Sequence, residues 1–163
     1  NQGEAAAEDA RFGAALTVGD FNADGAADLV AGIPGESFIA PSAGAIWVVY
    51  GVAGDGLPSS FDQLFHQRNL FGDEAEANDE FGRALTAGDY DGSGASDLIV
   101  GVPIENLEGI DANLAGGVHA VYSSELAGPP LRLTGLDAQF WTQNSPDVAG
   151  TAEQFDYFGQ AVR

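Results

Sequence analysis

A short acidic loop near the start of the chain places oxygen-bearing side chains at regular intervals. The stretch Asp20 to Val30 reads DFNADGAADLV, with a glycine at position 6. Positions 1, 3, 5 and 9 are Asp20, Asn22, Asp24 and Asp28. Asn, Asp and Gly are also the ordinary residues of tight turns, because they tolerate positive φ and hydrogen-bond their own backbone. Taken alone, the stretch leaves two interpretations open, a solvated hairpin turn and a cage for a metal ion.

A second copy of this loop lies 69 residues further along the chain. The stretch DYDGSGASD keeps a glycine at position 6 and has its oxygen-bearing residues at the same positions, Asp89, Asp91, Ser93 and Asp97. Two of these four positions differ in residue type from the first copy, and side-chain oxygen is what both versions share. A plain turn gives no reason for that pattern, so the pair of loops favours metal binding.

Calcium is the metal that best matches this set of ligands. It takes about six to eight oxygen ligands from carboxylates, amides, hydroxyls and carbonyls, whereas magnesium prefers few protein ligands and several waters. Each loop has three carboxylates, which would repel one another without a cation, and the backbone carbonyl of Ala26 or Ala95 at position 7 could add a ligand. An EF-hand is excluded, because position 12 is Ala31 or Val100 instead of a bidentate acid.

The two loops belong to a longer internal repeat. Arg11 to Pro34 aligns without a gap with Glu80 to Pro103, and the correspondence continues with small insertions through the rest of each unit. A further short copy begins at Phe158-Gly159. The sequence therefore predicts a first unit with its lead-in over residues 1–80, a second over 81–157 and the start of a third over 158–163.

Each unit reads as short strands separated by turn residues. We expect strands over Phe12 to Val18, Asp28 to Ile33 and Ile46 to Tyr50, and a fourth within Gln63 to Phe71 whose counterpart lies within Gln139 to Gln143. Four strands in roughly 70 residues are typical of a propeller blade, which must stack on neighbours to bury both faces. The predicted fold is all-β, with two four-stranded blades and the first strand of a third. The alternative is one β-sandwich containing a duplicated hairpin pair.

The motif FG…DxDxDGxxDL…GxP resembles the FG-GAP repeat of integrin α-chain propellers and their bacterial relatives. It is carried by Phe12-Gly13, Asp20 to Leu29 and Gly32 to Pro34, then by Phe81-Gly82, Asp89 to Leu98 and Gly101 to Pro103. The resemblance implies blades with calcium in the loop between the first and second strands, hence two calcium sites. The ligands that it implies are Asp20, Asn22, Asp24, the Ala26 carbonyl and Asp28, then Asp89, Asp91, Ser93, the Ala95 carbonyl and Asp97. Ser93 departs from the Asp or Asn usual in the family, so we expect weaker binding there.

Composition narrows the possible partners. The chain has 25 acidic against 5 basic residues and a formal net charge of −20, which argues against nucleic acid or an anionic membrane and permits cations. It has no cysteine, which excludes thiol catalysis, disulfides and cysteine-based zinc sites. No apolar run approaches the length of a membrane span, so no membrane insertion is expected.

Two blades cannot close the ring that propellers of this family form. We therefore expect the remaining blades to come either from a longer parent chain or from several copies of this chain, for example three. The chain starts at Asn1 without a visible signal peptide, which favours a processed protein or an excised piece. Extracellular or cell-surface location is inferred from calcium, because weak sites suit the high calcium concentration outside cells.

The resemblance implies a non-enzymatic module for extracellular adhesion to protein or matrix. The candidate ligand surface consists of the loops that differ between the two units, which are Gly35 to Ala43, Ile104 to Gly116 and the stretches before each later FG dipeptide. Two alternatives stay open: a lectin-like module and a purely structural sector of a larger secreted protein or enzyme. The aromatic residues that could contact sugar, or simply pack within the blades, are Trp47, Tyr50, Tyr122 and Trp141.

The histidines and acidic residues form no recognisable catalytic set, so we expect no enzyme activity. His66 and His119 occupy unrelated positions of the repeat, and His119 corresponds to Trp47, which favours packing. The chain shows no nucleophile elbow, no H-E-x-x-H and no phosphate loop. Glu74, Glu76 and Glu80 lie in an acidic linker and are expected to be solvated. Glu36 and Glu105 follow the Gly-x-Pro motif and are expected at the surface, with a supporting position near the calcium loop as the alternative.

Overall fold

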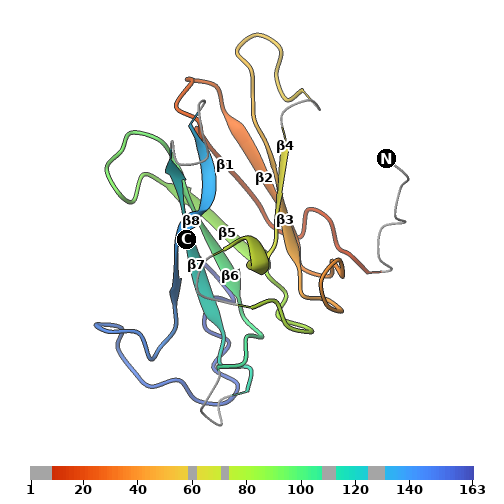
Figure 1. Cartoon of the computed structure of the whole chain (residues 1–163), viewed down its shortest axis with the longest axis vertical. Coiled ribbons are helices and arrows are strands. Elements are labelled where there is room, and N and C mark those ends of the chain that lie inside the picture. Colours follow the sequence, from red (N-terminus) through yellow and green to blue (C-terminus); the bar gives the residue numbers. More distant parts are fainter. Residues whose placement is uncertain (1–8, 59–61, 71–73, 108–112, 125–130) are drawn as a thin grey trace.

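The computed structural model describes residues 9–58, 62–70, 74–107, 113–124 and 131–163 and contains two antiparallel sheets of four strands each. In both sheets the strands follow chain order, β1-β2-β3-β4 and β5-β6-β7-β8 (Figure 1). The strands are β1 Leu16–Gly19, β2 Asp28–Ile33, β3 Ala45–Val49, β4 Asp62–Phe65, β5 Ala84–Gly88, β6 Asp97–Val102, β7 Gly117–Ser124 and β8 Arg132–Trp141. The predicted all-β fold with two four-stranded blades is confirmed; we call the β1–β4 sheet blade 1 and the β5–β8 sheet blade 2.

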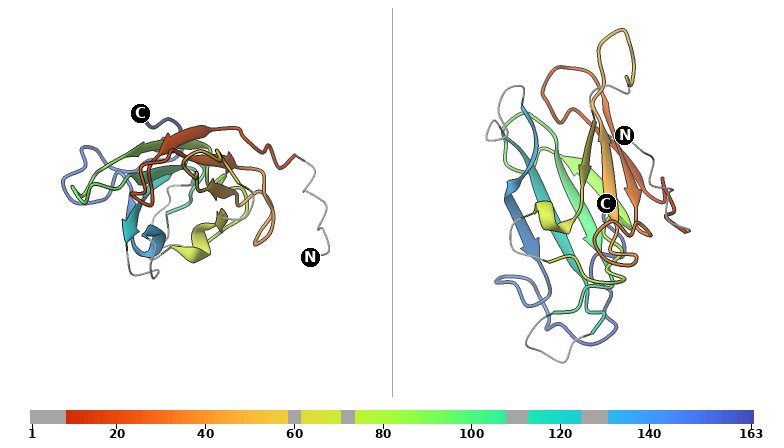
Figure 2. Two further views of the ribbon diagram at one scale, coloured as in Figure 1. Left: turned by 90° about the horizontal axis from the view of Figure 1, so that it is seen from above. Right: turned by 45° about the vertical axis from the view of Figure 1, so that its right-hand side comes forward.

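The two blades pack face to face around one apolar core. They lie closest along β1 and β5 and diverge toward β4 and β8 (Figure 2), as sectors of a propeller do. The core side chains come from alternate positions of the strands, because successive residues of a strand point to opposite faces. The principal members are Phe21, Val30, Ile46, Val48 and Phe65 of blade 1 and Phe81, Leu85, Leu98, Val100, Val121 and Leu133 of blade 2.

The fourth strand departs from its prediction in both blades. In blade 1 it ends at Phe65, and the next residues form a short 3-10 helix, η1 (Gln67–Asn69), instead of continuing the strand. The reason is the wedge between the diverging outer strands, which η1 fills. Its Asn69 carbonyl comes so near β8 that a Cβ on Gly135 would lie 1.9 Å from that oxygen. In blade 2 the strand begins at Arg132, well before the predicted segment, and follows the longer β7 across a register shift.

The FG dipeptides link one blade to the next, which the sequence did not foretell. Phe81 forms a parallel bridge with Gly44 of blade 1, and its neighbour Gly82 lies against Gly32 of the Gly-Ile-Pro segment. A Cβ on Gly32 would lie 2.0 Å from the Gly82 carbonyl oxygen, so only glycine permits this approach. The strand expected from Phe12 consequently starts later, at Leu16, because the FG residues form a turn.

The same contact recurs at the C-terminal end. Phe158 bridges Gly116 of blade 2, and its N–H donates to the Ala115 carbonyl at 2.8 Å. The predicted third unit therefore docks on blade 2 through its FG dipeptide, although residues 158–163 make no strand. No helix among the described residues is long and apolar enough to cross a membrane.

Candidate metal centre

The two acidic loops lie side by side at one end of the blades. Residues 20–27 connect β1 to β2 and residues 89–96 connect β5 to β6, which is where the sequence placed them. Both loops are at the upper end of the molecule in Figure 1. Backbone hydrogen bonding joins them directly, since the Ser96 N–H donates to the Asp20 carbonyl at 2.8 Å.

In the first loop the side-chain oxygens accept hydrogen bonds from the loop's own backbone. The Asp20 carboxylate accepts from the N–H groups of Asp24 at 3.1 Å and Gly25 at 2.9 Å. The Asn22 side-chain oxygen accepts from the Asp24 N–H at 3.1 Å, and the Asp24 carboxylate accepts from the Ala26 N–H at 2.8 Å. These bonds wrap the loop backbone around the side chains of positions 1, 3 and 5.

The second loop repeats this pattern with different residues. The Asp89 carboxylate accepts from the Gly94 N–H at 3.0 Å, Asp91 accepts from the Ser93 N–H at 2.8 Å, and the Ser93 hydroxyl accepts from the Ala95 N–H at 3.4 Å. In both loops, positions 1, 3 and 5 thus accept from the backbone at positions 6, 5 and 7. Such bonds hold a turn together on their own, so they describe a wrapped loop and do not identify a metal.

The carboxylate at position 9 of the first loop is buried at the start of β2. Asp28 is 1% exposed and accepts hydrogen bonds from the N–H groups of Phe21 at 2.8 Å and Gly51 at 2.7 Å. Burial raises the pKa of Asp28 above its usual value, and the charges of Asp20 and Asp24 add to this, while the two hydrogen bonds oppose it. A bound cation would offset both the cost of burying the Asp28 charge and its repulsion from Asp20 and Asp24.

Asp97 holds the corresponding position in the second loop and is fully buried. It accepts hydrogen bonds from the N–H groups of Tyr90 at 2.8 Å, Asp91 at 3.3 Å and Ser123 at 3.0 Å. The exposed Asp91 has a lowered pKa, chiefly because the Ser93 side chain hydrogen-bonds its carboxylate and the Ser93 N–H does so as well. Ser93 therefore stabilises the ionised carboxylate of Asp91, and its hydroxyl oxygen is also a possible metal ligand.

The structure brings the predicted carboxylates together more closely in the second loop than in the first. Oxygen atoms of Asp89, Asp91 and Asp97 all lie within 4.8 Å of one another. Among the described residues, the three carboxylates of the first loop do not form such a group, and there the Asn22 amide N–H donates to Asp24 at 2.9 Å. Both donor sets consist only of oxygen, which fits a hard cation such as calcium.

A second acidic group lies at the other end of the blades, and it was not predicted from the sequence. Carboxylate oxygens of Glu76, Asp79 and Glu105 lie within 4.8 Å of one another, and two of the three residues are buried. The Asp79 carboxylate accepts the Glu76 N–H, a turn repeated where Asp156 accepts the Glu153 N–H at 2.7 Å. The signal that could have found it is this repeated Glu-x-x-Asp spacing.

The expectation that Glu36 and Glu105 lie at the surface is wrong. They are 8% and 2% exposed. Each follows a Gly-x-Pro turn. The Glu36 carbonyl accepts the Gly44 N–H just before β3, and the Glu105 carbonyl accepts the Gly116 N–H just before β7. The Glu105 carboxylate also accepts from the Gln67 amide at 2.9 Å, which offsets part of the cost of its burial.

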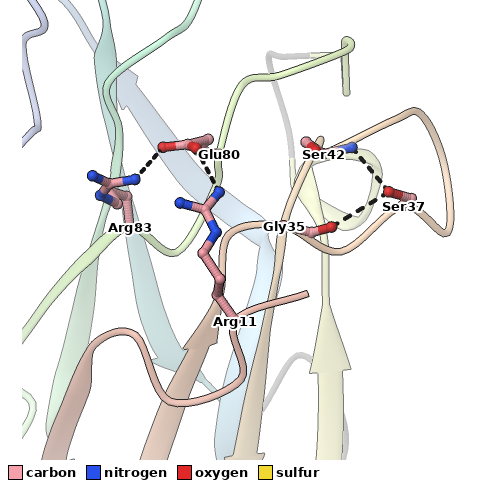
Figure 3. A network of polar contacts seen from close by, with 6 residues as sticks. All are labelled: Arg11, Gly35, Ser37, Ser42, Glu80 and Arg83. Atoms are coloured by element: carbon pink, nitrogen blue, oxygen red, sulfur yellow. Dashed lines mark hydrogen bonds and ion pairs between the residues drawn. The ribbon is translucent and has the colours of Figure 1, made fainter. Parts of the chain in front are cut away.

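Glu80 is also more than a solvated linker residue. Its carboxylate forms ion pairs with both Arg11 and Arg83, and the Glu80 side chain is 14% exposed (Figure 3). Arg11 precedes the FG dipeptide of blade 1 and Glu80 precedes that of blade 2, so the pair ties corresponding points of neighbouring units. The arginines are more exposed than the glutamate, so solvent screens these pairs.

The two histidines and the candidate aromatic residues take packing positions. His119 is fully buried, stacks on Phe140 at 4.7 Å between ring centroids and meets the edge of Phe81. This matches blade 1, where Trp47 meets Phe12 edge to face. His66 lies elsewhere, at the N-terminus of η1. Tyr50 is 3% exposed, whereas Trp47, Tyr122 and Trp141 are half-buried, so these three alone retain accessible surface among the sugar candidates.

Comparison with known proteins gives consistent matches. Residues 12–49 match the FG-GAP repeat. Human phosphatidylinositol-glycan-specific phospholipase D is 32% identical over 155 residues, covering 88% of this chain and 18% of that protein, and the bovine protein is 30% identical over 152 residues with the same coverage. Human integrin alpha-X is 39% identical over 94 residues, covering 56% of this chain and 7% of the integrin.

These matches agree with the geometry. The matched residues 12–49 contain the FG turn, the first acidic loop and β1 to β3 of blade 1, and the relatives' alignments extend over both blades. The chain spans less than a fifth of the length of the curated relatives it matches. Residues 12–49 therefore form an FG-GAP repeat, and the two blades, the FG contacts and the paired loops agree with that match.

Proposed function

We propose that the chain is a calcium-binding, extracellular FG-GAP module that serves in recognition of protein or matrix and has no catalytic activity of its own. The observation that carries this proposal is the pair of acidic loops. Both loops keep the same pattern of hydrogen bonds and a side-chain oxygen at each of the same positions, although Asn22 is replaced by Asp91 and Asp24 by Ser93. A cation is what both donor sets would serve.

The proposed ligands are the side chains at positions 1, 3, 5 and 9 and the backbone carbonyl at position 7. For the first site they are Asp20, Asn22, Asp24, Ala26 and Asp28, and for the second Asp89, Asp91, Ser93, Ala95 and Asp97. When bound, calcium would neutralise three carboxylates per loop and brace the hairpin between the first two strands. The chain's own backbone N–H groups already orient the carboxylates of the second loop, whereas binding at the first loop would also have to draw its carboxylates together.

The surface proposed for recognition lies at the opposite end of the blades. Residues 34–44 connect β2 to β3, whereas the acidic loops connect first to second strands, so the two sets of loops emerge at opposite ends. Within the connection from β2 to β3, the Ser37 hydroxyl accepts the Ser42 N–H and donates to the Gly35 carbonyl (Figure 3). The loop is thus held in one shape. The corresponding connection in blade 2 lies partly outside the described residues.

Two alternatives follow from particular observations. The half-buried Trp47 and Trp141 leave room for a lectin-like role. The chain aligns with only 18% of human phosphatidylinositol-glycan-specific phospholipase D, and this favours the alternative of a structural sector within a larger protein. We place catalysis outside this chain, because the described histidines are separated between core and η1 and take packing or capping positions.

A further blade of the same kind is the partner that we propose for blade 1. Its outer face exposes Leu16 and Val18 at 62% and 65%, while the corresponding position of blade 2, Leu85, is 9% exposed because blade 1 covers it. In the contact between the two blades of this chain, the face that carries Leu85 is therefore covered by a preceding blade. The covering blade would come from the rest of a parent chain or from another copy.

Calcium titration of the purified chain by calorimetry tests the metal proposal. We expect two calcium ions per chain, with the second loop weaker if its hydroxyl ligand is the poorer one. For sites with dissociation constants of about 10⁻⁴ to 10⁻³ M, about 1 mM calcium should stabilise the fold by about 0.4 to 1.4 kcal/mol per site. Excess chelator should therefore lower the melting temperature, and an unchanged melting curve together with no binding heat would refute calcium binding.

Array binding tests the recognition proposal separately. The chain should be probed against matrix proteins and glycans, each with calcium and with chelator. Retention on a protein ligand supports the adhesion role, and retention on glycans with loss in Trp47→Ala or Trp141→Ala supports the lectin-like alternative. If nothing is retained while calcium still binds, the structural alternative is favoured and the recognition proposal is wrong.

A further inference from the structure

The residue between two proposed ligands of the second loop contacts the first ligand residue of the first loop. The Ser96 N–H donates to the Asp20 carbonyl at 2.8 Å, and the Asp20 N–H donates to the Ser96 hydroxyl at 3.0 Å. Gly19 makes this approach possible, since a Cβ there would lie 2.8 Å from the Ser96 Cβ. Both backbone polar groups of Asp20 are therefore fixed by one residue of the neighbouring blade.

Ser123 at the end of β7 provides a second link at the same junction. Its N–H donates to the Asp97 carboxylate at 3.0 Å. Its hydroxyl lies 2.8 Å from the Phe21 carbonyl and 2.7 Å from the Ser96 carbonyl, so a single proton is shared between one acceptor in each loop. The side chain is buried, where such hydrogen bonds are strengthened by the low local dielectric.

Neither serine has a counterpart in blade 1. The residue corresponding to Ser96 is Ala27, which is exposed, and the residue corresponding to Ser123 is Gly51. At these two positions blade 1 therefore has no hydroxyl with which to bond a neighbouring loop. The two serines are therefore features of the junction and not of the acidic loop as such.

We propose that Ser96 and Ser123 couple the two loops, so that a divalent cation bound in either loop raises the affinity of the other. This inference rests on the calcium sites proposed above. A cation in the first loop fixes Asp20, and Asp20 then holds Ser96, which lies between the proposed carbonyl ligand Ala95 and the carboxylate of Asp97. Because coupling free energies are reciprocal, a cation in the second loop must favour the first by the same factor.

The test measures calcium affinity at the second loop with the first loop intact or disabled. Asn22→Ala with Asp24→Ala removes two exposed or half-buried ligands of the first loop without touching the serine links. In the otherwise unchanged chain, this should weaken calcium binding at the second loop by a factor of about five or more, the low end of usual coupling. With Ser96→Ala and Ser123→Ala also present, disabling the first loop should leave that affinity unchanged.

Ala27→Ser is the matched control, because it adds a hydroxyl at the corresponding position where no blade faces it. It should alter neither affinity nor coupling. If the variant lacking both hydroxyls fails to fold, Ser96→Ala alone carries the test, since it keeps the Ser96 N–H bond to Asp20. Amide hydrogen exchange gives a second readout: calcium at the second loop alone should slow exchange of the Asp20 N–H, and should not do so in Ser96→Ala.

The outcomes separate this inference from the metal proposal. Two calcium ions that bind with affinities independent of each other would overturn the coupling and leave the metal sites standing. Absence of calcium binding to the unaltered chain would overturn both. Coupling of equal size in the variant without the two hydroxyls would assign the effect to other contacts and so contradict the role of the serines.

Discussion

At the scale of single residues, the buried carboxylate at the end of each acidic loop does more than offer a ligand. Asp97 accepts three backbone N–H groups, two from its own loop and one from β7. It therefore closes the loop and joins it to the third strand of the blade. A carboxylate can accept at all of these points, because it presents two acceptor oxygens and no donor.

Replacement of Asp97 by Asn should damage both stability and metal binding. The amide would turn a donor toward a backbone N–H in a fully buried site, which costs about 1 to 3 kcal/mol of unfolding free energy. Calcium stoichiometry should fall from two to one. Urea unfolding and calorimetry measure the two effects, with Asp137→Asn on the exposed part of β8 as the control. Full stability in Asp97→Asn would contradict the role assigned to the carboxylate.

Tyr50 joins the blades through its phenol and makes stability sensitive to alkaline pH. Its hydroxyl donates to Gln63 and accepts the Leu133 N–H of blade 2 at 3.2 Å. Burial raises the pKa of Tyr50 from its usual 10.0 to about 12. The unfolded chain therefore loses this proton first, so the stabilising contribution is complete below pH 10.0 and is lost as pH rises toward about 12.

The expected measurement is unfolding free energy across that alkaline range. The unaltered chain should lose stability more steeply than Tyr50→Phe, which is less stable at neutral pH but lacks this ionisation. Tyr90→Phe, at a tyrosine that is 49% exposed, is the control for removing a phenol. Parallel pH profiles for the unaltered chain and Tyr50→Phe would show that the phenol does not link the blades as described.

At the scale of elements, the FG turn acts as a latch between blades, and glycine is required on both sides of it. Gly82 has φ +87°, and a Cβ there would lie 2.6 Å from the Ala45 carbonyl oxygen and 2.9 Å from the Ile46 side chain. Gly54 has the same φ of +87°, yet a Cβ there would meet nothing within 4 Å. The two positions therefore separate backbone strain from contact between the blades.

Gly82→Ala should be more destabilising than Gly54→Ala. Both variants carry the cost of a left-handed alanine, about 1 to 2 kcal/mol. Only Gly82→Ala also forces the latch apart, which adds about 1 to 3 kcal/mol, as overpacking usually does. Chemical denaturation of both variants gives the comparison. Equal losses of stability would mean that the latch yields without cost and does not hold the blades.

The sequence predicted most of the elements, because their signals are local and occur twice. The β2 strand, Asp28 to Ile33, was predicted with its observed bounds, and both acidic loops lie where their turn residues indicated. The fourth strands were placed less well, because η1 is shaped by the wedge between blades and not by its own residues. Burial of Glu36 and Glu105 depends on contacts between distant segments, which residue spacing does not reveal.

At the scale of the whole molecule, the two faces of blade 1 differ in what they meet. The inner face packs on blade 2, while the outer face carries Leu16, Trp47 and Leu64 in one cross-strand row with Ala31. In the equivalent row of blade 2, Leu85, Val100 and His119 are buried, and Leu85 and Val100 belong to the core between the blades. Repetition thus makes each blade complementary to the next, and blade 1 retains an apolar face suited to the same contact.

The outer face should make the isolated chain associate once its charge is screened. At low salt the net charge of −20 keeps copies apart, whereas high salt weakens this repulsion and strengthens burial of apolar surface. Sedimentation velocity should show a larger, concentration-dependent species at high salt. Leu16→Asp should abolish it, because the new charge lies on β1, in the strand position that corresponds to the buried Leu85 at the internal junction. Leu57→Asp, at an exposed leucine outside the strands, should leave it unchanged. A chain that remains monomeric at every salt concentration would show that the face does not bind a second copy and would favour a different blade as its partner.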